Sequence, residues 1–598
     1  MGVFPTAWGT AIVVPLYKKG DREVCDNYRG ISLLSVTSKI YTSIINSRLY
    51  NWAESNNKIN EEQAGFRRNY STVDHIFTLH TIASNCLYGN KRSKLYAVFI
   101  DFQKAFDTVN RDKLWKILEK IGVSTKMITT LKAIYSYVKA IIRQGHERTP
   151  EINCPRGVRQ GCLLSPLLFS LLVAEIAYQV AEGGRTGYQL IPGAQEIFAL
   201  LFADDMVLLS LTPRGLQTQI NNLKLAAETL GLIVNLDKTK IIVFRKGGFL
   251  SRQEKWFFGR EQIEVVNSYK YLGYTMTTKL SIEIPLSEYA GKAKGRVISI
   301  FKTLYKLGKI EPGIFFKLFD TQIKPVLLYA AEMWGLASED IIQTIEKVHM
   351  FACKRLLGVT SRTPNTLVQA ELNRFPLRID AQTRAVKYWA KIQNLGEERL
   401  PKQAYLRELR EKNKPGNWAE GIKHILTTNG YAYVWENGGV EYITSFCKGF
   451  KQRLIDQFWQ NWHSNLMASN RYDMYRTFKF NHSLEKYVES LTVSKFRRVY
   501  ARFRLGITNL RNNERFLRPL SSRTCQLCTS DMIENESHFL LQCPIFQEFR
   551  VKYLLQCWIT LENLTVNDLI ANDNTTVIKC SALYIYQALR HRESLLSL

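Results

Sequence analysis

Two adjacent aspartates interrupt one of the most apolar stretches of the sequence. Asp204 and Asp205 lie in FALLFADDMVLLSL (residues 198–211), which contains no lysine, arginine or histidine. A buried carboxylate without a partner costs several kcal/mol or takes up a proton, and two neighbouring carboxylates repel each other. We therefore expect a compensating positive charge, and a bound divalent cation is the simplest one.

A third carboxylate ends another apolar run. In KLYAVFIDFQKAFDTVNRDKLW (residues 94–115), aromatic and β-branched residues lead to Asp101, which predicts a buried strand with an acid at its carboxyl end. The run around Asp204 and Asp205 predicts two short strands with the pair at the turn between them. Adjacent strands lie about 4.8 Å apart, so Asp101 and Asp204 could share ions if the strands are neighbours. Such oxygen ligands suit Mg²⁺, and two ions of this kind promote phosphoryl transfer. Taken alone, Asp101 would be better explained as a helix cap or a turn residue.

The surrounding sequence predicts the elements that would position these acids. Leu216, Ile220, Leu223, Ala227 and Leu230 recur at helical spacing, and Gly231 follows as a stop signal. Another helix is expected to begin at Ser165–Pro166. Just before it, Gly157 and Gly161 bracket VRQ, which favours a tight turn that brings backbone close to a ligand.

Composition indicates a globular protein with a polyanionic partner. The chain has 598 residues, of which 46% are hydrophobic and 22% charged, and its net charge is +28. Such an excess favours nucleic acid, although a merely basic protein is the alternative. Eleven scattered cysteines and no recognisable secretory signal favour a reducing compartment, nuclear or cytoplasmic rather than secreted. We found no apolar run long enough to span a bilayer, so no membrane partner is expected.

Two features near the carboxyl end point to nucleic acid as well. The segment SKFRRVYARFRLGITNLRNNERFLRP (residues 494–519) mixes basic and aromatic residues, which suits single-stranded nucleic acid, although a solvated helix face is the alternative. The spacing C-x2-C-x9-H-x4-C of Cys525, Cys528, His538 and Cys543 suits one tetrahedral, structural Zn²⁺. Zinc knuckles of this size bind nucleic acid. The alternative is four unconnected, reduced side chains.

Together, the motifs over residues 11–276 resemble, in content and in order, those of the reverse transcriptases of non-LTR (long interspersed element) retrotransposons. FADD resembles the catalytic hairpin, FIDFQKAFD the first metal-binding strand, and RGVRQGCLLSPLLFSLL the floor of the nucleotide site. Two stretches resemble the fingers motifs, IVVPLYKKGDREVCDNYRGISLLSVTSKIYTSIINSRL and NEEQAGFRRNYSTVDHI. Two later stretches resemble the end of the palm, GLIVNLDKTKIIVF and YKYLGYTM.

The resemblance implies roles for individual residues. Asp101 and Asp204 would bind the catalytic metals, with Asp205 beside them. Phe106 would crowd a ribose 2′-hydroxyl and so select deoxynucleotides, unless it is a plain core residue. Gln160 and Gly161 would lie beside the incoming nucleotide.

Further roles concern the triphosphate and the primer. Lys238 resembles the general acid for the pyrophosphate leaving group, although Lys240 has equally suitable spacing. Lys18 and Arg29 resemble residues that hold the triphosphate. Tyr271 and Gly273 resemble the primer grip. The chain departs from the family at Gly30, where a proline is usual.

The expected fold is α+β, with a right-hand polymerase followed by a helical region and a zinc knuckle. Fingers and a β-α-β, ferredoxin-like palm would occupy residues 1–278, and a helical thumb would occupy 279–375. A helical, basic region (376–515), a CCHC zinc knuckle (516–560) and a tail helix (561–598) would follow. Within the thumb, Trp334 and Tyr329 are expected to be core residues.

The predicted function is RNA-directed DNA polymerisation with two Mg²⁺ ions, an RNA template, a DNA primer and deoxynucleoside triphosphates. The chain starts within the fingers pattern and lacks the endonuclease of whole elements, so we expect an amino-terminally truncated copy. An inactive relic that still binds RNA or DNA is the alternative. A group II intron-type enzyme is a further one, against which FADD and the late knuckle argue. The sequence does not fix the subunit count.

Overall fold

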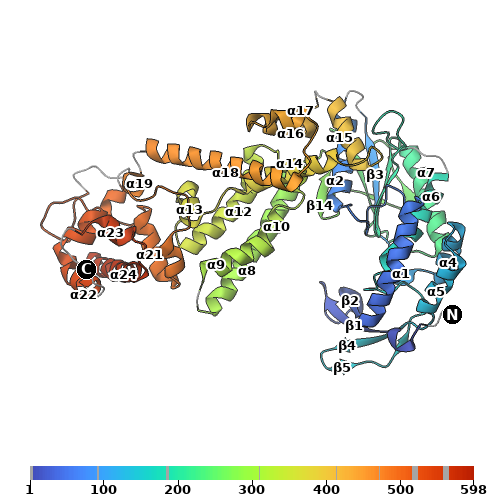
Figure 1. The fold of residues 1–598 in the computed structure, drawn as a ribbon, viewed down its shortest axis with the longest axis horizontal. Helices are drawn as coiled ribbons and strands as arrows, with labels where there is room; N and C mark the ends of the chain where they lie inside the picture. Colours follow the sequence, from blue (N-terminus) through green and yellow to red (C-terminus); the bar gives the residue numbers. More distant parts are fainter. Residues whose placement is uncertain are drawn as a thin grey trace. The chain divides into compact units, whose positions relative to one another are not determined.

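The computed structural model (Figure 1) describes residues 4–89, 93–182, 187–252, 254–308, 310–411, 414–469, 472–514, 523–555 and 564–597. The chain forms two compact units. The first comprises residues 1–281 and 391–421, and the second comprises residues 282–390 and 422–598. The predicted domains are finer than this division, and their boundaries stay predictions. Residues 391–421, which were expected within a separate helical region, lie in the first unit.

A five-stranded sheet in the order β12-β9-β3-β8-β7 is the centre of the first unit. Its strands are β3 (Leu95–Ile100), β7 (Ala199–Phe202), β8 (Asp205–Ser210), β9 (Lys240–Phe244) and β12 (Glu264–Val265). All six residues of β3 are buried, because β3 lies between β8 and β9 and both of its faces are covered. Tyr96, Val98 and Ile100 belong to the main hydrophobic core, whereas Phe99 stacks on Tyr269 from the other side.

A second sheet precedes and interrupts the first one along the chain. It contains β1 (Thr10–Tyr17), β2 (Tyr28–Leu33), β4 (Lys139–Gln144), β5 (Glu147–Arg148) and β6 (Ile152–Asn153). Strands β1 and β2 form an antiparallel hairpin, and β1 also pairs with β4 in parallel. Two short hairpins complete the unit's strands: β10 (Phe257–Phe258) with β11 (Glu261–Gln262), and β13 (Ser268–Tyr271) with β14 (Tyr274–Thr277).

Helices pack against these sheets. They are α1 (Val36–Ser55), α2 (Thr72–Tyr88), α3 (Ala105–Thr108), α4 (Arg111–Lys120), α5 (Thr125–Ser136), α6 (Ser165–Glu182), α7 (Pro213–Leu230) and α15 (Leu400–Arg410), with 3₁₀ turns at Thr6–Trp8 and Cys25–Asn27. The predicted helix that ends at Gly231 is α7. Thr212 caps its first turn, and Gly231 ends it with φ +75°, a conformation that favours glycine.

Residues 391–421 attach to α2 through buried polar contacts. Lys414 is paired with Glu408, and its ammonium also donates to Asn85 Oδ1 in α2 over 3.1 Å. The indole ring of Trp418 packs against Phe77 with a centroid distance of 4.9 Å. Because Lys414, Glu408, Asn85, Phe77 and Trp418 are all buried, the segment is part of the core of the first unit.

The second unit is built from helices in its described residues. They are α8 (Glu283–Lys306), α9 (Pro312–Leu318), α10 (Lys324–Leu327), α11 (Ala331–Trp334), α12 (Glu339–Leu357), α13 (Asn365–Leu372), α14 (Leu377–Gln393), α16 (Trp418–Thr428), α17 (Ala432–Glu436), α18 (Ile443–Ala468), α19 (Asp473–Arg476), α20 (Lys486–Ser490), α21 (Ser494–Arg504), α22 (Gln547–Leu554), α23 (Val566–Ile570) and α24 (Thr575–Leu596). Helices α14 and α16 begin or end in the first unit.

Short irregular turns join some of these helices. Phe319–Ile323 and His538–Gln542 are π-helical turns, and Arg511–Glu514 and Pro544–Phe546 are 3₁₀ turns. Trp334 is buried, as expected, and Tyr329 is half-buried. Within the part of the chain that the structure describes, every helix is too short or too polar to cross a membrane.

Candidate active site

The Asp204–Asp205 pair lies at the tip of the β7–β8 hairpin. Phe202 pairs with Asp205, so Ala203 and Asp204 form the turn. Ala203 has φ +58°, which is unfavourable for a residue with a side chain and matches the twist that two-residue hairpins require. The predicted pair of short strands with the acids between them is therefore present. The turn directs both carboxylates to solvent at one end of the central sheet.

Strand register brings Asp101 to the same place. Ile100 of β3 pairs with Met206 of β8, so Asp101 and Asp205 follow and precede paired residues on neighbouring antiparallel strands. Burial and the negative charges of Asp204 and Asp101 raise the pKa of Asp205 to about 6. Burial and Asp101 also raise the pKa of Asp204, although Arg29 and Lys238 oppose this change. The side chains of Asp204 and Asp205 are exposed to solvent on one side, and neighbouring segments of the chain crowd them on the other. Asp101, Asp204 and Asp205 thus lie together at one end of the sheet, and closely spaced carboxylates can hold divalent cations.

The basic residues proposed for the site lie at different places. Lys238 donates to Asp101 Oδ2 over 3.0 Å, whereas Lys240 forms an ion pair with Glu264 at 2.7 Å. Spacing could not separate these two lysines, and the geometry brings only Lys238 to the acids. Arg29, on β2, is close enough for its charge to act on Asp204. Lys18 is exposed beyond the end of β1, with its backbone N–H bonded to Asn27.

The proposed nucleotide-site residues gather around the short helix α3. The Phe106 ring stacks on Phe169 of α6 with centroids 4.5 Å apart, so it is partly a core residue. Gln160 donates to Asp107 Oδ1 over 2.9 Å. Gly161 has φ +80°, and a Cβ there would lie 2.8 Å from the carbonyl oxygen of Ser32.

Gly157, like Gly161, has a left-handed backbone and no room for a side chain. Its φ is +84°, and a Cβ would lie 2.7 Å from the Asp107 carbonyl oxygen. Gly157, Gln160 and Asp107 line a cavity of about 420 Å³ that also borders β1, β2 and β4. Sequence reasoning did not select Asp107. No local pattern distinguishes Asp107 from other polar residues near the start of a helix, and only the fold shows that it binds Gln160.

The proposed primer-grip residues occupy the β13–β14 hairpin. Leu272 and Gly273 form its turn with φ +47° and +86°. The Tyr271 ring is buried against Phe99, and burial with the charge of Asp205 raises the pKa of its hydroxyl well above the usual value. Tyr269, which sequence reasoning missed, stacks on Phe99 with centroids 4.5 Å apart. Burial, Asp205 and Asp101 raise the pKa of Tyr269 to about 12. Strand alternation relative to Tyr271 would have pointed to it.

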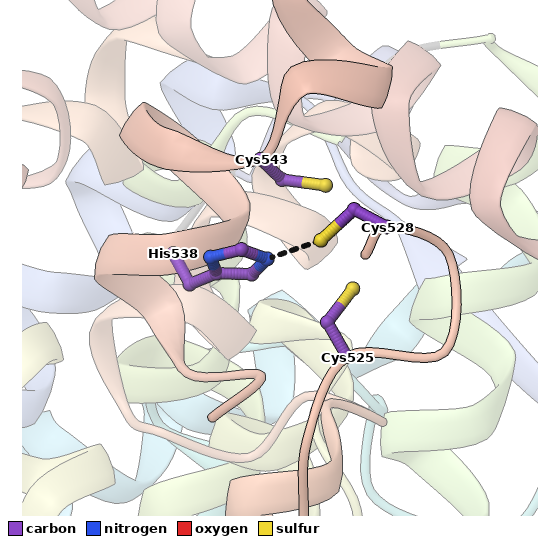
Figure 2. A group of neighbouring side chains, drawn as sticks. All are labelled: Cys525, Cys528, His538 and Cys543. Carbon is purple, nitrogen blue, oxygen red and sulfur yellow. Dashed lines mark hydrogen bonds between the residues drawn. The ribbon is translucent and has the colours of Figure 1, made fainter. Parts of the chain in front are cut away.

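In the second unit, Cys525, Cys528, His538 and Cys543 converge (Figure 2). The ligand atoms of the four side chains all lie within 4.8 Å of one another. Tetrahedral Zn²⁺ with Zn–S bonds of about 2.3 Å needs sulfur atoms roughly 3.8 Å apart, so three sulfurs and one nitrogen in this space fit zinc. The sequence-based prediction therefore identified residues that the fold brings together.

Buried hydrogen bonds and an ion pair hold the chain segments that carry the cysteine and histidine cluster. Arg592 of α24 forms an ion pair with Glu534, with both nitrogen–oxygen distances 2.7 Å. Arg550 donates to the carbonyl oxygen of Cys543 over 2.7 Å. Burial and the neighbouring thiols Cys525 and Cys528 raise the pKa of Cys543 to about 12. The loop is therefore held in place by residues that do not themselves belong to the ligand set.

The basic and aromatic segment before this cluster is partly structural. Its helix α21 buries Arg497, Tyr500, Phe503 and Arg504, which are therefore unavailable for stacking or for phosphate. Lys495 and Arg498 are exposed. The last residues of the segment lie outside the described part of the chain.

Comparison with known proteins gives a family match within the first unit. Residues 17–276 match the family model described as reverse transcriptase (RNA-dependent DNA polymerase). The chain is 26% identical over 388 residues to the Pol polyprotein of the R2 retrotransposable element of Popillia japonica, covering 62% of this chain and 51% of the relative. It is 24% identical to the RNA-directed DNA polymerase of the jockey element of Drosophila melanogaster, covering 66% and 42%. The chain thus spans about half, or less, of these curated relatives.

The match supplies the fold of the first unit, a mixed α/β polymerase of the right-hand type, as the motifs implied. A solved structure of telomerase from Candida tropicalis aligns with 75% of this chain and 70% of its own, at 12% identity and a TM-score of 0.37. A likeness at that level supports no conclusion about function.

Proposed function

We propose that this chain is an RNA-directed DNA polymerase of the kind that non-LTR retrotransposons carry, because residues 17–276 match the reverse transcriptase family and the curated relatives come from such elements. It would extend a DNA primer along an RNA template with deoxynucleoside triphosphates. The observation that carries the proposal is the convergence of Asp101, Asp204 and Asp205 at one end of the central sheet. All three acids lie inside the matched residues.

The acids suit two divalent cations, which we propose to be Mg²⁺ held by Asp101, Asp204 and Asp205. When bound, such ions stabilise the attacking and leaving oxygens of the phosphoryl transfer. Burial and the neighbouring carboxylates raise the pKa values of Asp204 and Asp205, and a nearby cation would offset both effects, which supports this assignment. Lys238, already at 3.0 Å from Asp101, would give a proton to the pyrophosphate as it leaves.

The other residues would position the substrates. Arg29 and Lys18, on the β1–β2 hairpin, would bind the triphosphate, and Arg29 is the better supported because its charge reaches Asp204. Phe106 would exclude a 2′-hydroxyl, with Gln160 and Gly161 beside the nucleotide. Tyr271 and Gly273 would hold the primer terminus, since their hairpin lies close enough for Asp205 to act on Tyr271.

Helix α8 supports a role for residues 279–375 in gripping the duplex. Ser287, Gly291, Gly295 and Ser299 are spaced four residues apart, and all four are exposed. A helix face without large side chains would let the helix backbone approach a groove of the nucleic-acid duplex. Lys292 and Arg296 lie beside this face and are exposed, so they could contact phosphate. This geometry fits a template–primer duplex better than a protein core.

For the second unit we propose one structural Zn²⁺ at Cys525, Cys528, His538 and Cys543, in a knuckle that contributes to nucleic-acid binding. The donor set and its spacing support this proposal. An inactive relic that binds RNA or DNA remains the alternative function, and the assay below separates the two.

The test is template-dependent incorporation of a labelled deoxynucleotide. The chain is incubated with Mg²⁺, an RNA template and a DNA primer, and a primer ending in a dideoxynucleotide serves as the matched control. Growth of the first primer alone would support the proposal. If the protein binds the RNA–DNA hybrid but leaves both primers unchanged, the relic interpretation replaces it.

A further inference from the structure

Residues 62–66 run alongside the free edge of the strand that leads to the catalytic turn. The Leu201 N–H donates to the carbonyl oxygen of Glu62 over 2.8 Å, and the Ala64 N–H donates to that of Leu201 over 2.9 Å. Because β7 is the last strand of the central sheet, this pairing closes its open edge. The loop is thus bonded to the hairpin that carries Asp204.

The side chain of Gln63 reaches the turn itself. It is fully buried, and its Oε1 atom accepts hydrogen bonds from the Gly65 N–H at 2.9 Å and the Ala203 N–H at 3.3 Å. Ala203 immediately precedes Asp204 and has the left-handed φ of +58°. A backbone conformation that costs energy persists where neighbouring groups hold it, and the Gln63 amide is such a group.

Gly65 adds a steric constraint to the same turn. A Cβ at this position would lie 2.2 Å from the Ala203 nitrogen and 2.9 Å from the Phe202 carbonyl carbon. Real side chains do not approach backbone so closely, so only glycine allows the loop to lie against the hairpin. The position of the turn and the position of the loop therefore depend on each other.

The next residue faces the other way. The Phe66 ring is 54% exposed, although it follows four buried positions. Its φ is +62°, which is rare for a bulky residue and is found most often at functional sites. The ring lies edge-on to Phe106, with centroids 6.4 Å apart and an angle of 88° between the planes. Phe66 and Phe106 thus form adjoining aromatic surfaces next to the acids.

Polar contacts on both sides fix this loop. The Arg67 guanidinium donates to the carbonyl oxygens of Asn60 and Gln63 over 2.9 and 3.1 Å. It also forms an ion pair with Glu54 of α1 at 2.8 Å. From residues 391–421, Arg399 binds Glu61 at 2.9 Å. A loop held in this way is rigid enough to position what it touches.

We propose that residues 62–66 are a positioning loop with two roles. Through Gln63 and Gly65 it fixes the turn that presents Asp204 and Asp205. Through Phe66 it supplies a second wall, beside Phe106, of the pocket that receives the sugar of the incoming nucleotide. The second role rests on the proposed polymerase function, whereas the first requires only that the acids bind a divalent cation.

The first role is tested by Mn²⁺ binding, followed by electron paramagnetic resonance of the free ion. Gln63→Met keeps the length of the side chain and removes the acceptor, so Mn²⁺ affinity should fall about three- to tenfold, the equivalent of one hydrogen bond. Gly65→Ala should have the same effect through its clash with Ala203. The matched control is Gln219→Met. Gln219 is also buried, but it donates to the carbonyl oxygen of Leu209, at the end of β8 away from the acids. Wild-type affinity in both loop variants would overturn this role.

The second role is tested by nucleotide affinity in the presence of the primer–template. Deoxy- and ribonucleoside triphosphates with a methylene bridge between the α- and β-phosphates bind without reacting. Phe66→Ala should reduce the preference for the deoxy analogue about fivefold or more, and Phe66→Tyr should retain it. An unchanged preference in Phe66→Ala would overturn the second role. Because neither assay needs turnover, a chain that binds Mn²⁺ and nucleotide but never extends a primer would refute the polymerase proposal without refuting the first role of the loop.

Discussion

Replacing Arg504 by methionine should destabilise the second unit far more than removing a neighbouring exposed arginine. Arg504 belongs to the basic segment that the sequence assigns to nucleic-acid binding, yet it is buried. Its guanidinium donates to Glu371 over 2.9 and 3.1 Å and to Glu485 over 2.6 Å. It also donates to the carbonyl oxygen of Ile570, so this one cation of α21 joins α13, the residue that precedes α20, and α23.

The magnitude follows from what the substitution leaves behind. Glu371 has 0% of its surface exposed, and removing one partner of a buried ion pair costs about 3–5 kcal/mol. Burial by itself raises the pKa of Glu371, but Arg504 and Lys479 hold it below the usual value. Without Arg504 that pKa should rise above its value in the unfolded chain. Folding would then take up a proton, so the loss of stability should be larger at pH 8 than at pH 5.

Denaturant unfolding, followed by a probe in the second unit, measures this loss. The control is Arg498→Met on the same helix, where the side chain is exposed and the change should stay within about 0.5 kcal/mol. Nucleic-acid affinity is measured on the same samples. If Arg504→Met weakened RNA binding while leaving stability within about 1 kcal/mol, the structural explanation of this arginine would be wrong.

Three further predictions concern other parts of the chain. Phe106→Ala should raise the use of ribonucleotides relative to deoxynucleotides about tenfold or more in single-turnover incorporation, and an unchanged ratio would count against its role. Cys543→Ser should remove close to one zinc per chain in elemental analysis and make residues 523–555 sensitive to protease; full zinc content would contradict the assigned ligand set. Burial and the charges of Arg399 and Arg67 lower the pKa of His75 to about 3, so its contribution is complete above pH 6.5 and is lost as the pH falls below that value. We expect His75 to account for about 2 kcal/mol of the stability lost between pH 7 and pH 5, and His75→Leu should remove that share of the dependence.

The acids of the site and the turn that holds them could be predicted from the sequence, because each depends on a short stretch of residues. The apolar runs around Asp101 and Asp204 predict strands, and a two-residue turn between apolar strands exposes whatever it contains. The family resemblance added the order of the motifs. For the cysteine and histidine cluster, spacing alone was sufficient, because four ligands within nineteen residues can meet without knowledge of the remaining fold.

Other features depend on contacts between distant residues, which no local pattern records. Lys238 and Lys240 have equivalent spacing, and only strand pairing at β9 sends one to Asp101 and the other to Glu264. Gln63 reads as an ordinary polar loop residue until the loop pairs with β7, 138 positions later in the chain at Leu201. In the basic segment the sequence predicted too much. Its charge and aromatic content suggested nucleic-acid binding throughout, but they do not distinguish a buried Arg504 from an exposed Arg498.

The central claim is that Asp204 holds a metal for RNA-templated DNA synthesis. Its most direct test is the addition of a single deoxynucleotide to a DNA primer on RNA by wild type, Asp204→Asn and Asp112→Asn in Mg²⁺. Asp112 is an exposed acid on α4, so its amide variant controls for the loss of one charge. We predict addition by wild type and Asp112→Asn and none by Asp204→Asn. Addition by Asp204→Asn at the wild-type rate would contradict the account.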